Sequence, residues 1–237
     1  MKPDALRNIR MLAMGAALLL AGGHVAADEV QCKDYWHTRS QWEEMRARCE
    51  EGARNGDPLS QVALAIYLLD GPDPAGRSRA QALLSSAAAA GYDDAYYWLG
   101  TSQADKKKAV DYLEKATGRG AMGLLALATA ADMRFKGDCV PKDFDQARTV
   151  FRRAQEAQAS NIDHRIPEPP GEWWSNAKWW AAVSALALGA ERYGYEIKTV
   201  NGKAVVAATT PHPELSDKEL AQRIQDRMNG ASGRDNA

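Results

Sequence analysis

Small and apolar residues recur at helical spacing through the middle of the chain, between residues 45 and 157. The clearest copy places Ala147, Val150, Phe151 and Ala154 on one helical face. The same offsets recur twice upstream, at Ala80, Leu83, Leu84 and Ala87 with Gly91, and at Ala109, Tyr112, Leu113 and Ala116 with Gly120. Alanines let a neighbouring helix approach closely, and a glycine after the helix can adopt the left-handed conformation. The pattern therefore predicts packed amphipathic helices with an alanine seam, and in the two upstream copies a glycine ends the helix.

The stretch from Gly137 to Ala157 resembles the Sel-like repeat, a relative of the tetratricopeptide repeat. The positions that carry this resemblance are Gly137, Val140, Pro141, Lys142, Asp143, Phe144, Ala147 and Ala154. Cys139 stands where the family usually has a glycine, and the second repeat has lost its turn glycine and several loop residues. The resemblance implies an all-α fold, a right-handed α-solenoid of stacked antiparallel helix pairs. It also implies protein binding, and it implies no reaction.

The first 27 residues have the pattern of a secretory signal peptide. Basic residues precede an apolar run from Met11 to Ala21, and Val25 and Ala27 suit the small-residue rule at a cleavage site. The run of about 11 apolar residues is too short for a membrane span, which needs ~20. We expect cleavage after Ala27 and a periplasmic protein without a stable membrane span. Cleavage would leave a net charge near −3, which disfavours nucleic acid as a partner.

Three cysteines, Cys32, Cys49 and Cys139, follow the leader and would enter an oxidising compartment. One of them must lack a partner within the chain. The short separation favours a disulfide between Cys32 and Cys49, which would stabilise the first helix by about 3 kcal/mol in the chain-entropy model.

Interruptions of the helical pattern predict where one structural segment of the chain ends and the next begins. Prolines and glycines make the segment 71–76 a non-helical loop, and Asn201-Gly202 between two β-prone runs predicts a type I′ hairpin. Ser216 and Glu219 form a predicted capping box. The expected order is a signal peptide at 1–27, an N-terminal cap helix at 28–57, helical repeats at 58–157, a tryptophan-rich segment with a capping helix from about Asn176 at 158–192, a hairpin and helix at 193–230, and a disordered tail at 231–237.

Aromatic residues outside the alanine seam are the candidates for partner binding. Tyr96, Tyr97 and Trp98 fall on a first helix of a pair, and in such solenoids the first helices line the concave face. Packing between helices is the other interpretation of these rings. Trp173 and Trp174 either seal the end of the helical stack or anchor another protein.

Known catalytic motifs are missing from the sequence. It contains no His-Glu-x-x-His, no Gly-x-Ser-x-Gly and no glycine-rich phosphate loop. We therefore expect no enzyme, no catalytic or metal-binding residues and no cofactor. The expected function is an exported adaptor or scaffold that binds another protein through its concave face in the bacterial envelope. The alternative is a periplasmic immunity protein that neutralises a phospholipase-type toxin of type VI secretion. A β-lactamase-like hydrolase is a weaker option, because such relatives carry regularly paired cysteines that this chain lacks.

Overall fold

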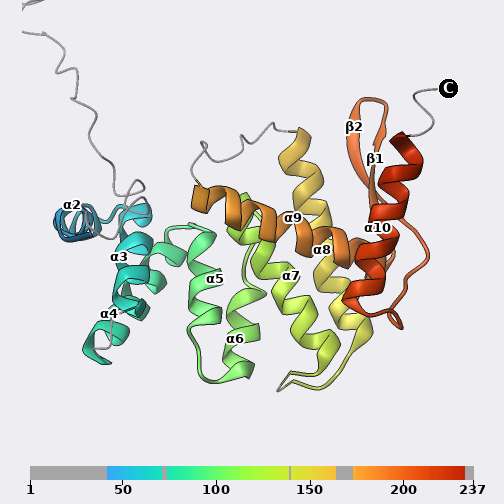
Figure 1. Cartoon of the computed structure of the whole chain (residues 1–237). Helices are drawn as coiled ribbons and strands as arrows, with labels where there is room; N and C mark the ends of the chain where they lie inside the picture. The colour runs from blue at the N-terminus through green and yellow to red at the C-terminus, as the bar shows by residue number, and fades with distance from the viewer. Residues whose placement is uncertain (1–41, 71–73, 139, 164–172, 233–237) are drawn as a thin grey trace, which may run out of the picture. The chain divides into compact units, whose positions relative to one another are not determined.

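The computed structural model describes residues 42–70, 74–138, 140–163 and 173–232, all within one compact unit. These ranges contain nine helices and a small two-stranded antiparallel sheet near the C-terminus (Figure 1). The elements are α2 (Trp42–Arg54), α3 (Pro58–Asp70), α4 (Pro74–Ala89), α5 (Asp94–Thr101), α6 (Lys106–Leu113), α7 (Gly120–Lys136), α8 (Phe144–Asp163), α9 (Trp173–Tyr193), β1 (Tyr195–Val200), β2 (Lys203–Ala208) and α10 (Asp217–Ser232). The expectation of a mainly helical chain that ends in a hairpin and a helix is confirmed. Across the described ranges, no helix is both long and apolar enough to cross a membrane.

Contacts between helices follow a regular order along the chain. Each helix from α2 to α8 contacts the next one, and α3, α5, α7 and α9 also contact each other in series. Helix α7 lies at the centre of these contacts, because it touches α5, α6, α8 and α9. It is accordingly buried on most of its surface, including Met122, Leu124, Ala126, Leu127, Ala130 and Ala131.

The predicted alanine seam is confirmed. Its six alanines are at most 3% exposed: Ala80, Ala87, Ala109, Ala116, Ala147 and Ala154. Leu84, Leu113 and Phe151 occupy the equivalent position in each copy and are equally buried. Small side chains let the helices approach, and one large apolar side chain per copy fills the space between them.

Two of the predicted helix boundaries need correction. Gly91 ends α4 in the left-handed conformation, at φ 81°, as expected. Gly120 does not end a helix: α6 stops at Leu113, and Gly120 is the first residue of α7. The prediction that 71–76 is a loop is wrong from Pro74 onward, because α4 begins there. Proline suits the first helical position, where its missing N–H has no intrahelical partner to lose.

Helices α8 and α9 are both longer than the sequence pattern predicts. Helix α8 continues to Asp163, beyond the expected end of the repeats at Ala157. Helix α9 begins at Trp173 instead of about Asn176, so the first tryptophan pair belongs to a helix. The predicted signal peptide, Cys32 and Cys139 lie outside the described residues.

The C-terminal hairpin and helix form as predicted. Val200 pairs with Lys203, and Asn201 (φ 51°) and Gly202 (φ 77°) have the positive φ angles of a type I′ turn. The Ser216 backbone N–H donates to Glu219 Oε2 at 2.8 Å, while the Glu219 N–H donates to Ser216 Oγ at 3.3 Å, which is the reciprocal pattern of a capping box. The hairpin contacts α8 and α9, and α10 contacts α9. Helix α10 continues to Ser232, past the predicted end, and residues 233–237 are not described.

Candidate functional site

The second helix pair is much shorter than its neighbours, and a groove lies beside it. Helices α5 and α6 have 8 residues each, against 16 in α4 and 17 in α7. The groove has a volume of about 500 Å³ and is lined by α4, the end of α5 and α6. Its polar lining residues are Gln81, Ser85, Gln103, Lys108, Asp111, Tyr112 and Lys115. We call this feature the α4–α6 groove.

Positive charge is in excess in the α4–α6 groove. Lys108 and Lys115 line it together with one carboxylate, Asp111. Lys106, Lys107 and Lys108 are exposed at the start of α6, and Asp105 caps that helix by accepting from the Lys107 N–H at 2.9 Å. In the described part of the chain these four lysines form no ion pair. The groove therefore favours an acidic or hydrogen-bonding surface over a basic one.

The three aromatic residues predicted on the concave face, Tyr96, Tyr97 and Trp98, are all half-buried on α5. Tyr96 packs against both the apolar cluster of α3–α5 and the larger cluster around α7, and its hydroxyl donates to the Ala88 carbonyl at 3.5 Å. Tyr96 thus joins two parts of the core. The interpretation as a packing residue holds for this side chain.

Tyr97 and Trp98 form a ring pair beside Tyr96. Their ring centroids are 5.4 Å apart at an interplanar angle of 85°, an edge-to-face contact. Burial raises the pKa of the Tyr97 hydroxyl above its ordinary value of 10.0, so this group is a neutral donor near neutral pH. Tyr97 also packs against the larger cluster around α7 and Trp98 against the cluster of α3–α5, and each ring keeps part of its surface exposed.

Other predicted site residues are placed only in part. Trp173 and Trp174 lie in the first turn of α9, but their side chains are outside the described residues. Cys49 is 1% exposed on α2, where it packs with Ala53, Ala63 and Leu64. Because Cys32 is not described, the Cys32–Cys49 disulfide stays a prediction.

Asp93, just before α5, carries a buried carboxylate that sequence reasoning missed. The residue is 6% exposed, and its carboxylate accepts from the backbone N–H groups of Thr117 (2.9 Å), Gly118 (2.7 Å) and Arg119 (2.9 Å). The Thr117 hydroxyl donates to it as well, at 3.2 Å. A Cβ on Gly123 would lie 2.1 Å from Asp93 Oδ2, so glycine makes room for this oxygen. Both oxygens are used by the turn before α7, and Asp93 is therefore a structural group, not a catalytic one.

Metal ligands do not gather in the described ranges, where no three His, Cys, Asp or Glu side chains form a candidate metal site. Of the four histidines in the sequence, only His212 is described; its Nδ1 lies 3.3 Å from Glu214 Oε1. Comparison with protein-family models, with curated proteins and with solved structures gives no match.

Proposed function

We propose that the chain is an exported, right-handed α-solenoid that binds another protein in the bacterial envelope as an adaptor or scaffold. The observation that supports this proposal most strongly is the order of helix contacts. Successive helices touch, and α3, α5, α7 and α9 also touch each other in series. A stack of helix pairs requires both kinds of contact, because each pair buries its apolar face against the next pair. Export rests on the signal-peptide pattern of residues 1–27.

The proposed recognition surface is the face of the alternate helices. All five candidate aromatic residues belong to this series, since Tyr96, Tyr97 and Trp98 lie on α5 and Trp173 and Trp174 begin α9. Tyr97 and Trp98 offer half-buried rings, and rings of this kind often carry much of the affinity at protein interfaces. The α4–α6 groove adds lysines that suit an acidic segment of the partner.

The test combines affinity capture from periplasm with measurements on purified variants. Tyr97→Ala should weaken binding of the captured protein by about 1–4 kcal/mol. The melting temperature and the helical signal of the free variant should stay close to those of the wild type. Tyr195→Ala is the matched control, because Tyr195 is half-buried on the hairpin and outside the α3–α9 series. This control should leave the affinity unchanged.

Two outcomes would contradict the proposed surface. One is unchanged affinity for Tyr97→Ala with an intact fold, and the other is a loss of affinity that simply follows a loss of stability. The identity of the captured partner separates the roles: an envelope component supports the adaptor, whereas a secreted phospholipase toxin identifies an immunity protein.

A further inference from the structure

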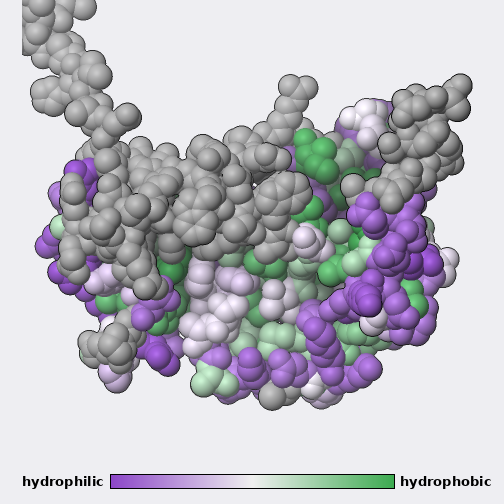
Figure 2. All heavy atoms as spheres, viewed as in Figure 1, coloured by the Kyte–Doolittle hydropathy of each residue, from purple (hydrophilic) through white to green (hydrophobic). Residues whose placement is uncertain are grey.

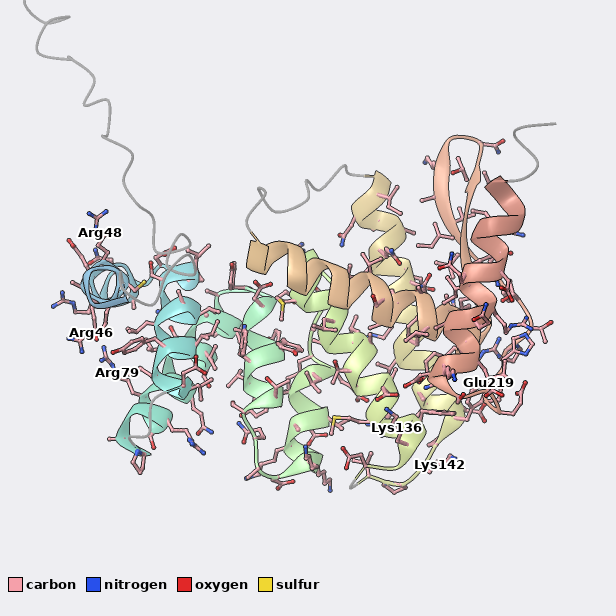
Figure 3. The ribbon with its side chains drawn as sticks, viewed as in Figure 1. Arg46, Arg48, Arg79, Lys136, Lys142 and Glu219 are labelled. Atoms are coloured by element: carbon pink, nitrogen blue, oxygen red, sulfur yellow. The ribbon has the colours of Figure 1, made fainter. Side chains whose placement is uncertain are left out.

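A second cavity lies where α7, α8 and α9 meet the start of α10, away from the α4–α6 groove. Its volume is about 220 Å³. Ala128, Phe151 and Leu188 give it apolar walls, and charged side chains from three helices complete the lining. Lys136, labelled in Figure 3 at the end of α7, is one of these charged residues. We call this feature the Arg192 cavity.

The charges of the Arg192 cavity are already balanced. Lys136 Nζ lies 2.8 Å from Asp132 Oδ2, and Arg192 Nη1 lies 3.5 Å from Asp132 Oδ1. Arg192 Nη2 also pairs with Asp217 Oδ1. Two cations and two carboxylates thus give a formal charge of zero, and each has a partner of opposite sign. The Arg192 guanidinium is held further by the Phe135 ring, whose centroid lies 4.6 Å away.

Two polar atoms at this cavity are buried and have no hydrogen-bond partner among the described residues, namely Arg192 Nε and the Tyr193 hydroxyl. Their residues, which both line the cavity, are only 6% and 2% exposed. Burial is the main cause that raises the pKa of Tyr193, and the charges of Asp132 and Asp217 raise it further. The phenol therefore stays protonated and sits within the field of the cavity's carboxylates. Native proteins rarely leave buried donors unpaired, so a missing acceptor is indicated.

We propose that the Arg192 cavity binds a small uncharged molecule through an acceptor oxygen, such as an amide or ketone carbonyl, on a compact apolar body. Arg192 Nε and the Tyr193 hydroxyl donate to that oxygen, and the apolar walls contact the body. An ion of either sign would bring a charge without a partner beside ion pairs that already balance one another. A cavity of 150 Å³ accommodates benzene, so 220 Å³ has room for roughly nine non-hydrogen atoms.

Three probes of one shape and different charge test this proposal on the full chain. Benzamide is neutral, benzoate is an anion and benzamidine is a cation, and all three have the same number of non-hydrogen atoms. We expect benzamide to shift the NMR signals of Leu188 and Tyr193 with a Kd in roughly the millimolar range, as befits a fragment of this size. It should bind at least about tenfold more tightly than either ion. Tightest binding by an ion, or no shift with any probe up to about 20 mM, would overturn the proposal.

Tyr193→Phe removes only the oxygen from the buried ring. If that hydroxyl serves a ligand, the variant should bind benzamide about fivefold more weakly. Its ligand-free melting temperature should be unchanged or higher, because an unpaired buried donor has gone. Tyr195→Phe, a hydroxyl deletion outside the cavity, should change neither quantity. A destabilised Tyr193→Phe that binds benzamide normally would mean that the hydroxyl serves the fold through an ordered water, and would overturn the proposal.

Discussion

The interior between α4 and α8 and the C-terminal end of the chain are stabilised by different means. Between α4 and α8 the helices meet through seam alanines with almost no exposed surface, and the buried carboxylate of Asp93 is held by backbone N–H groups. Between α9 and α10 the contacts are largely ionic: Glu191 pairs with Arg223 and Arg227. Leu220 is the fully buried apolar residue of α10 within its described part. In the view of Figure 2, the surface over α10 is accordingly mostly hydrophilic.

This difference predicts that substitutions in the two regions lower the stability of the protein by unequal amounts. A seam alanine has no other rotamer, and a backbone N–H group cannot turn to find another acceptor, so the interior has few ways to relax. Arg223 and Arg227 have side chains that are 48% and 63% exposed, and water and salt screen such pairs. Single substitutions should therefore lower the free energy of unfolding most in the interior and least at the C-terminal end.

Asp93→Ala should have the largest effect on stability. It leaves the buried Gly118 N–H and the partly exposed N–H groups of Thr117 and Arg119 without their acceptor. An unpaired buried group costs about 1–3 kcal/mol, so the total loss should be about 3 kcal/mol. Urea unfolding measures it. Asp111→Ala is the control, because Asp111 is an exposed carboxylate on α6 and its removal should cost under about 0.5 kcal/mol. Similar losses for both variants would show that the Asp93 hydrogen bonds do not stabilise the fold.

Ala87→Leu tests the seam itself and should have the next largest effect. Ala87 is 0% exposed, so extra methylenes must displace a neighbouring helix, at a cost of about 1–3 kcal/mol. Ala89, in the same helix, is exposed, and Ala89→Leu should change stability by less than about 0.5 kcal/mol. Thermal unfolding of both variants gives the comparison. Equal melting temperatures would refute close packing along the seam.

Features that depend on local sequence were the ones that could be predicted. The seam repeats at fixed offsets because helical periodicity places Ala80 and Ala87 on one face, whatever the partner helix is. The hairpin turn follows from Asn201-Gly202, since few residues adopt positive φ easily. The capping box needs only Ser216 and Glu219 at their spacing.

Features that join distant segments were not predicted. Asp93 accepts hydrogen bonds from a turn more than twenty residues later in the chain. Neither Asp93 nor that turn carries a recognisable sequence motif. The Arg192 cavity gathers residues from four helices, and nothing in the local pattern pairs Asp132 with Arg192. One feature of the sequence pointed to the α4–α6 groove: the second copy of the pattern lacks several loop residues. The helices of that copy, α5 and α6, are short. The predicted start of α4 was wrong because proline was interpreted as a helix breaker, whereas Pro74 is the first residue of this helix.

The smallest expected effect is a pH dependence at the start of α10. Glu219, labelled in Figure 3, accepts hydrogen bonds from the Ser216 hydroxyl and backbone N–H, and these bonds lower its pKa below the ordinary value of 4.5. A lowered carboxyl pKa means that folding favours the ionised form. The resulting stabilisation is fully present above pH 4.5 and is lost as the pH falls through the pKa of the folded state.

Glu219→Gln isolates this contribution, because glutamine still accepts the capping hydrogen bonds but does not titrate. Between about pH 6 and about pH 3, the melting temperature of the wild type should fall more steeply than that of the variant. The other carboxylates of the chain act equally in both proteins and cancel in the difference. NMR titration of the Glu219 carboxyl carbon gives its pKa in the folded state directly. A value at or above 4.5, or parallel melting curves for the two proteins, would mean that the capping box does not favour the ionised carboxylate.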